Sequence, residues 1–128
     1  MSGLFVPSVQ TGNLVFVSGH IAKRNGEPWV GRLGETMTTA EGQQAARAVA
    51  EDLLKTLGDL SRVKRIVKVM VLVNSAPDFT EQHLVANGAS ELLKEKISEH
   101  ARSAFGVAQL PYGVCVEIEL VAELHGGN

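Results

Sequence analysis

The sequence predicts a two-layer α+β sandwich in which two helices cover one face of a mixed β-sheet. Two stretches have helical periodicity, the segments around them have strand character, and the elements follow the order β-β-(β)-α-β-α-β-β. The chain has 128 residues, of which 45% are hydrophobic and 20% are charged. This composition is typical of one globular domain, which we expect to span residues 1–128.

The N-terminal part predicts two short hairpins. Residues 14–22 are rich in β-branched and aromatic side chains, which favours a strand, and we expect residues 6–9 to pair with it. Asn25-Gly26 is a strong hairpin signal because both residue types tolerate positive φ. We therefore expect a short strand near residues 28–31 that pairs back.

Two amphipathic helices follow. Thr38-Thr39-Ala40-Glu41 has the capping-box pattern, and Gly58 is a typical helix stop. A second start pattern, Asp78-Phe79-Thr80-Glu81, comes after Pro77. The apolar positions at helical spacing are Ala46, Val49, Ala50, Leu53, Leu54 and Leu57 in the first helix and Ala86, Ala89, Leu92, Leu93 and Ile97 in the second.

The remaining strands are expected at residues 66–73, 102–108 and 114–124, with a turn at Leu110-Pro111-Tyr112-Gly113. Residues 66–73 are almost wholly apolar, which is typical of a strand buried on both faces. The chain has no third helix to cover the second face of the sheet. We infer that a subunit interface covers it.

Composition and charge exclude several classes. The formal net charge is −2, without the basic excess of a dedicated nucleic-acid binder. The single cysteine excludes an intrachain disulfide framework, and the four scattered histidines do not have metal-ligand spacing. No apolar run reaches the roughly 20 residues of a membrane span, and residues 1–5 do not resemble a signal peptide. We expect a cytoplasmic protein without a metal, a nucleic-acid partner or a membrane.

The last strand carries an unusual second face. Period-2 alternation places Val114, Val116, Ile118, Leu120 and Ala122 on one face, and Cys115, Glu117, Glu119, Val121 and Glu123 on the other. Three carboxylates on one face are either a solvated surface or the lining of a shared cavity. In a cavity, burial would raise the pKa of a glutamate toward a value useful for proton transfer.

Arg102 stands fifteen positions before Glu117, on the other side of a turn. In a hairpin the two residues would come roughly opposite each other. Arginine presents a planar fork of donors that suits a carboxylate ligand, so the pair would bind an organic acid and move a proton on it. A purely structural ion pair is the alternative, and the spacing leaves both interpretations open.

The sequence resembles the RidA family, also called the YjgF or reactive intermediate deaminase family, over nearly its whole length. The matching segments are Asn13-Leu14-Val15-Phe16-Val17-Ser18-Gly19, Asn87-Gly88-Ala89-Ser90-Glu91, and Ala101-Arg102-Ser103 through Val116-Glu117-Ile118-Glu119. The segment Val73 to Phe79 and the sequence around Gly106 and around Tyr112-Gly113 resemble a divergent, less characterised branch. The resemblance implies a chorismate-mutase-like fold and a homotrimer with a central β-barrel and clefts between subunits.

The resemblance also implies an activity: hydrolysis of reactive 2-imino or enamine acids to 2-keto acids and ammonia, without a cofactor. By position, Arg102 matches the arginine that binds the substrate carboxylate, and Glu117 matches the glutamate that activates water. Ser18, Gly19 and Asn87 match cleft residues. Two positions depart from the family pattern: Phe5 replaces a cleft tyrosine, and Ala104 replaces a cysteine.

Two other functions remain as alternatives. One is a non-catalytic trimer that binds small carboxylic acids such as 2-keto acids; it would keep Arg102 and leave Glu117 without a role. The other is an RNA-cleaving or translation-related function, a label that members of the family also carry. The net acidic charge speaks against this second alternative.

Overall fold

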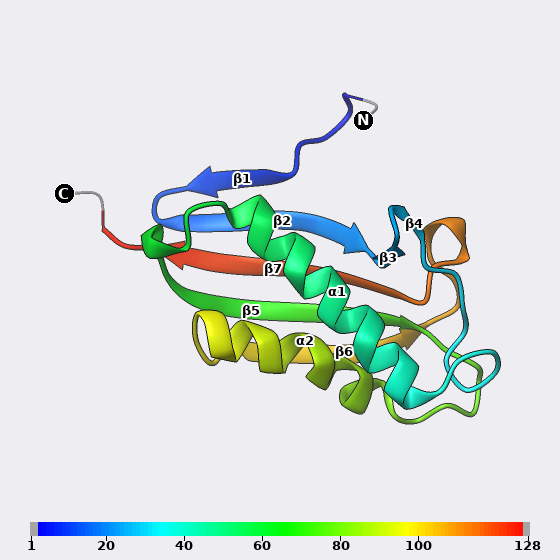
Figure 1. The fold of residues 1–128 in the computed structure, drawn as a ribbon. Helices are drawn as coiled ribbons and strands as arrows, with labels where there is room; N and C mark the ends of the chain where they lie inside the picture. The colour runs from blue at the N-terminus through cyan, green and yellow to red at the C-terminus, as the bar shows by residue number, and fades with distance from the viewer. Residues whose placement is uncertain (1–2, 127–128) are drawn as a thin grey trace.

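The computed structural model describes residues 3–126 and confirms a mixed α+β fold with one main sheet and two helices (Figure 1). The main sheet has the strand order β1-β2-β7-β5-β6, and a small second sheet pairs β3 with β4. The elements are β1 (Ser8–Thr11), β2 (Leu14–Ile21), β3 (Lys23–Arg24), β4 (Glu27–Pro28), α1 (Thr39–Leu57), β5 (Val63–Asn74), α2 (Gln82–Lys96), β6 (Ala101–Val107) and β7 (Val116–Leu124), with 3-10 turns at Leu60–Arg62 and Pro111–Gly113.

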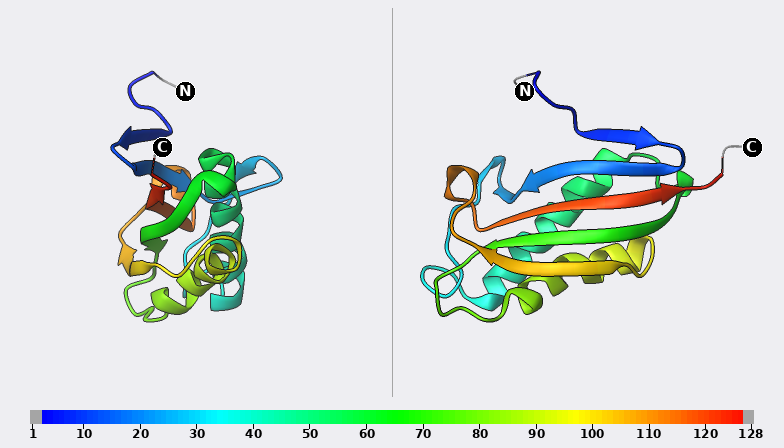
Figure 2. Two further views of the ribbon diagram at one scale, coloured as in Figure 1. Left: turned by 90° about the vertical axis from the view of Figure 1, so that its left-hand side faces the viewer. Right: turned by 180° about the vertical axis from the view of Figure 1, so that it is seen from behind.

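Both helices lie on the same side of the sheet, and the other side is uncovered in the single chain (Figure 2). The core lies between these two layers. On β7 the alternation is as predicted, because Val116, Ile118, Leu120 and Ala122 are all at most 2% exposed. Cys115 is also fully buried and belongs to this core, so it does not share the open face with Glu117 as predicted.

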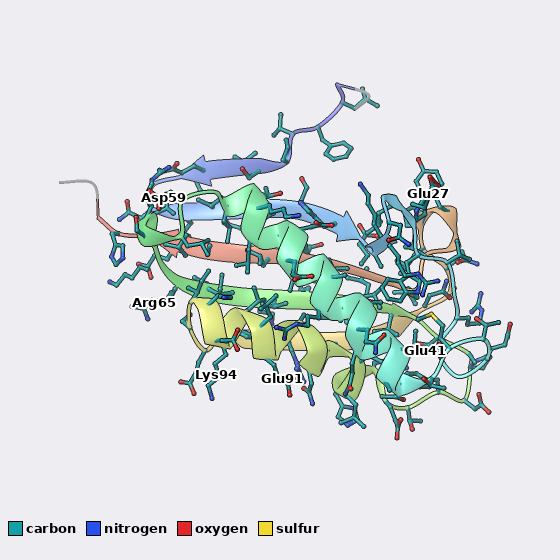
Figure 3. The ribbon with its side chains drawn as sticks, in the orientation of Figure 1. Glu27, Glu41, Asp59, Arg65, Glu91 and Lys94 are labelled. Atoms are coloured by element: carbon teal, nitrogen blue, oxygen red, sulfur yellow. The ribbon has the colours of Figure 1, made fainter. Side chains whose placement is uncertain are left out.

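Helix α1 begins and ends where the sequence predicts. Thr38 Oγ1 accepts a hydrogen bond from the Glu41 amide at 3.2 Å, and Glu41 Oε1 accepts one from the Thr38 amide at 2.9 Å. These bonds satisfy amides at the helix start, and the bond from the Thr38 amide holds the pKa of the Glu41 carboxylate below its ordinary value. Glu41 is labelled at this end of α1 in Figure 3. Gly58 ends the helix with a positive φ of 79°.

Some predicted boundaries are wrong. Helix α2 begins at Gln82, and its N-cap Glu81 makes no side-chain capping bond. The pattern at Asp78 therefore precedes the helix without starting it. The first strand lies at Ser8–Thr11, two residues later than predicted. The hairpin at Asn25-Gly26 is confirmed: both residues have positive φ, but its second strand is only Glu27–Pro28.

Strand β5 is buried on one face only in the single chain, whereas the sequence predicts burial on both. Val69, Val71 and Val73 are fully buried under the helices, while Met70 and Leu72 on the opposite face are half-buried. This difference arises because no element of the described chain covers the second face of the sheet.

The predicted hairpin between the strands of Arg102 and Glu117 is wrong. Strand β6 pairs with β5 in parallel, while β7 pairs antiparallel with β5 on its other side and with β2. The chain after β6 therefore crosses over β5 instead of folding straight back. Arg102 lies opposite Val69 on β5, and Glu117 lies opposite Leu72.

In the described part of the chain, no helix is both long enough and apolar enough to cross a membrane.

Candidate functional site

Strand β6 is an edge strand, and it presents Arg102 toward helix α2. The Nη1 group donates to Asn87 Oδ1 at 2.9 Å and to Ser90 Oγ at 3.1 Å, and Nη2 donates to the His83 carbonyl at 3.3 Å. The three acceptors stand at helix positions i, i+4 and i+7, which form one stripe along α2. The helix thus holds the half-buried guanidinium from one side.

These bonds leave part of the guanidinium available. Arginine has five N–H groups, and the three bonds to α2 use both hydrogens of Nη1 and one of Nη2. Within residues 3–126, Nε makes no hydrogen bond, so Nε and the remaining Nη2 hydrogen are two neighbouring donors without a partner in the described chain. A planar pair of donors with this spacing matches the two oxygens of a carboxylate.

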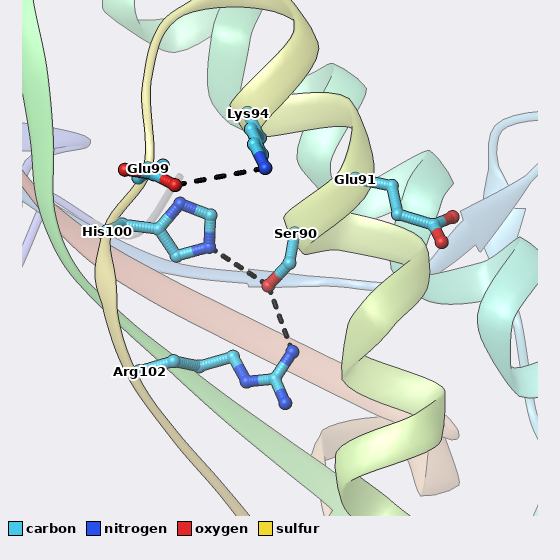
Figure 4. A pocket seen from close by; sticks show the side chains of 6 residues that line it. All are labelled: Ser90, Glu91, Lys94, Glu99, His100 and Arg102. Atoms are coloured by element: carbon cyan, nitrogen blue, oxygen red, sulfur yellow. Dashed lines mark hydrogen bonds and ion pairs between the residues drawn. The ribbon is translucent and has the colours of Figure 1, made fainter.

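Arg102 lines a small polar pocket between α2 and the strand that carries it (Figure 4). The pocket has a volume of about 320 Å³, and its other lining residues are Ser90, Glu91, Lys94, Glu99 and His100. Glu91 and Lys94 project from the outer side of α2 (Figure 3). We call Asn87, Ser90, His100 and Arg102 the arginine half-site.

The three carboxylates on β7 have different environments. Glu123 is paired with Arg65 at 2.8 Å, and Glu119 is exposed. Glu117 is half-buried, and burial raises its pKa above the ordinary glutamate value. The charge of Glu119 raises this pKa further, and His20 partly opposes the increase. The raised pKa makes Glu117 a candidate for proton transfer.

Glu117 lies against the neighbouring strand β2 at Gly19. A Cβ built on Gly19 would lie 3.1 Å from Cδ of Glu117 and closer still to Oε2, so the carboxylate occupies the space that a side chain would fill. Next to Gly19, Ser18 donates from Oγ to the Val6 carbonyl at 2.7 Å and from its amide to the Pro7 carbonyl at 2.8 Å. These bonds fix the segment that carries Phe5.

Phe5, Ser18 and Gly19 line one broad cavity of about 1200 Å³ between β2 and helix α1, and Glu117 is not among its lining residues. Phe5 is 61% exposed, so its ring is a large apolar surface at the cavity mouth. We call Phe5, Ser18, Gly19 and Glu117 the glutamate half-site. The sequence-predicted site residues thus form two groups, each assembled by local hydrogen bonds or close packing.

Arg102 and Glu117 lie on opposite faces of the sheet. Arg102 is opposite Val69, which is buried under the helices, and Glu117 is opposite Leu72, which faces the uncovered side. Directly opposed residues of neighbouring strands point to the same face. Arg102 and Glu117 therefore do not share a pocket within one chain. If the two act together, they do so across a boundary between chains.

The structure also places the two positions that depart from the family pattern. Ala104 is half-buried on the helix-facing side of β6 and packs against the core. Cys115 does not replace the missing thiol, because it is fully buried and burial raises its pKa to about 11. A thiol with this pKa is protonated at neutral pH and is a poor nucleophile.

Sequence reasoning missed Ser90 and His100. Ser90 follows Asn87 by three residues on α2, and His100 precedes Arg102 by two residues at the start of β6. The first spacing places Ser90 on the same helix face as Asn87, and the second places His100 on the same side of the chain as Arg102. The sequence around Arg102 therefore contains a local signal for both residues. The same reasoning does not show that helix and strand faces meet, which requires the packing of α2 on β6.

Fold and half-sites together define a small mixed α+β protein with one candidate group of residues beside its edge strand β6 and another on its central strand β7 and the neighbouring β2. The chain belongs to the family described as Endoribonuclease L-PSP, whose model matches residues 1–124 and which includes the RidA proteins. This confirms the resemblance read from the sequence.

Individual relatives support the assignment. Protein TCP17 from Trypanosoma cruzi is 48% identical over 130 residues, which cover 94% of this chain and 81% of that protein. A crystal structure of a protein of unknown function from Agrobacterium tumefaciens is 38% identical with a TM-score of 0.91, covering 94% of this chain and 82% of that one. The crystal structure of TdcF from E. coli with bound serine is 25% identical with a TM-score of 0.66, covering 96% and 90%.

Proposed function

We propose that this protein hydrolyses small, reactive 2-imino acids to 2-keto acids and ammonia at clefts between its subunits. The observation that carries the proposal is the geometry of Arg102. Its guanidinium is hydrogen-bonded to α2 through Nη1 and Nη2, and Nε and the second Nη2 hydrogen remain as a pair of donors. The ligand of TdcF, serine, is a small amino acid with a carboxylate. A 2-imino acid has the same carboxylate next to its reactive carbon.

The chemistry requires little beyond orientation and a base. The iminium carbon is already electrophilic, so water adds to C2 once the substrate is held by its carboxylate. Glu117 takes a proton from the attacking water as the new C–O bond forms. It passes this proton to the nitrogen of the addition intermediate, and it then takes the proton of the new hydroxyl group as the C–N bond breaks, the C=O bond of the keto acid forms and ammonia is released. Ammonia takes up this second proton and leaves as ammonium, which returns Glu117 to its ionised form. The raised pKa of Glu117 suits both transfers.

The proposal includes a homotrimer with a central barrel, because the two half-sites need chains packed against each other. The uncovered face of the sheet has the character of an interface: Val9, Leu14, Phe16 and Phe105 are between 37% and 56% exposed there. If a neighbouring chain packs on this face, it covers these side chains. The edge strand that carries Arg102 then lies close to the Glu117 of the next chain.

The direct test follows the decay of an enzymatically generated 2-imino acid, such as 2-aminoacrylate and its imine, with and without the protein. We expect acceleration by the wild type and its loss in Arg102→Ala and Glu117→Gln. Lack of acceleration with every imino acid tried would contradict the proposal. Saturable binding of 2-keto acids without turnover would favour the alternative of a non-catalytic binder. RNA cleavage that disappears in Arg102→Ala would favour the family's ribonuclease description instead.

A mixing experiment tests the shared cleft. Arg102→Ala and Glu117→Gln chains are unfolded together, refolded, and assayed against each variant refolded alone. In a cyclic trimer whose sites combine two neighbouring chains, random mixing of equal amounts restores roughly a quarter of the sites. Activity that stays at the level of the separate variants, with mixed trimers verified by mass spectrometry, would exclude a site built from two chains.

A further inference from the structure

The arginine half-site contains a chain of hydrogen bonds that extends beyond Arg102 (Figure 4). Nδ1 of His100 lies 3.2 Å from the Ser98 carbonyl, and its Nε2 lies 2.9 Å from Ser90 Oγ. Ser90 Oγ in turn accepts from Nη1 of Arg102 at 3.1 Å. The chain thus links a backbone carbonyl in the loop before β6 to the guanidinium of Arg102 on β6.

When the imidazole is neutral, the donor and the acceptor of each hydrogen bond in this chain are fixed. A carbonyl only accepts, so Nδ1 carries the ring hydrogen and Nε2 is the acceptor. Ser90 then donates its hydroxyl hydrogen to His100 and keeps its lone pairs for Arg102. The serine oxygen is consequently oriented toward Nη1, and it cannot rotate away without losing its bond to the histidine.

We propose that Ser90 and His100 are positioning residues that fix the Arg102 guanidinium for the substrate carboxylate. The inference rests on the proposed function. Arginine side chains have a large rotamer entropy, so ordering a free guanidinium on a ligand would reduce the affinity for that ligand. Asn87 and the His83 carbonyl hold the group toward the start of α2, and Ser90 holds it from the next turn. The bonds from both turns of α2 are needed to orient the Nε and Nη2 donors toward the substrate carboxylate.

The network lies at a half-buried edge of the molecule, outside the core residues. Removing the Ser90 hydroxyl therefore leaves the packing of α2 intact. Its effect falls on ligand binding, and an assay can separate this effect from one on folding.

The test compares Ser90→Ala, Ser90→Thr, His100→Ala and His100→Gln with the wild type in the imino-acid assay. Loss of one hydrogen bond to a charged group predicts about a tenfold increase in KM for Ser90→Ala, with kcat changed less than about twofold. Ser90→Thr and His100→Gln keep an oxygen in place and restore KM. Glu95→Ala is the control, since Glu95 is exposed on α2 away from this pocket. In an Arg102→Lys background, Ser90→Ala should add no further loss.

Arginine side-chain NMR gives a readout that does not depend on turnover. A guanidinium held by hydrogen bonds rotates slowly about its C–N bonds and shows separate Nη signals. These signals should merge in Ser90→Ala. An unchanged KM and unchanged signals in Ser90→Ala, with an active wild type, would overturn this inference and leave the proposed function standing. A wild type that hydrolyses no imino acid would contradict the proposed function. If it also fails to bind 2-keto acids, this inference fails as well.

Discussion

Substituting Gly19 by alanine separates the position of the Glu117 carboxylate from the stability of the fold. A Cβ at this position would lie 3.1 Å from Cδ of Glu117 and closer still to Oε2. Gly19 is not among the glycines with positive φ, so alanine fits its backbone without strain. The one group that must move is the end of the Glu117 side chain, which is flexible.

The size of the expected effect follows from this contact. Carbon and oxygen atoms rest at about 3.5 Å, so Oε2 must retreat by about 1 Å. A misplacement of about 1 Å in a catalytic group can cost about 100-fold in rate. Stability should change in the opposite direction, since replacing a compatible glycine by alanine stabilises by about 0.4–1 kcal/mol through the unfolded chain. Gly19→Ala is therefore expected to be as stable as the wild type or slightly more stable, and nearly inactive.

The assay measures imino-acid hydrolysis and urea denaturation on the same preparations. Gly126→Ala is the matched control, because no atom lies within 4 Å of the position of its Cβ. The double variant Gly19→Ala/Glu117→Gln should be no slower than Glu117→Gln alone. Full activity in Gly19→Ala would refute the reasoning, since the position of the carboxylate would then not matter for the reaction.

Three further predictions concern stability and reactivity. Because the pKa of Glu117 is higher in the folded than in the unfolded chain, ionisation of Glu117 destabilises the fold above the folded-state pKa and has no effect below the unfolded-state pKa. Glu117→Gln should therefore raise Tm at pH 7 but not at pH 3. Equal shifts of Tm at the two pH values would contradict this. In Gly88→Ala a Cβ would lie 2.7 Å from the carbonyl carbon of Gln43, which belongs to the backbone and cannot move aside. We therefore expect the free energy of unfolding, measured with urea, to fall by about 2 kcal/mol, although alanine improves the helix propensity by about 1 kcal/mol. Gly42→Ala meets only side-chain ends and should cost less; an equal cost would speak against the backbone clash. Cys115 should resist iodoacetamide at pH 8 in the folded protein and react once the chain is unfolded, and labelling of the native chain would contradict its burial.

Much of this protein could be predicted from local patterns. The capping box at Thr38 and Glu41, the Asn25-Gly26 turn and the alternation along β7 depend on neighbouring residues, and the structure contains all three. Such signals are reliable because a helix start, a tight turn and a strand face each involve few residues close in sequence. The candidates Arg102 and Glu117 were also identifiable, from residue type and from the resemblance to the RidA family.

The tertiary structure decided how these residues relate to each other. The spacing of fifteen residues between Arg102 and Glu117 suggests a hairpin, but β6 pairs with β5 in parallel and β7 lies on the other side of β5. Strand order depends on which apolar faces pack together across the whole chain, and sequence spacing does not contain that information. The pairing placed the guanidinium under the helices and the carboxylate on the open face. The same packing joined Ser90 and His100 to Arg102, a contact between a helix and a strand that no local pattern specifies.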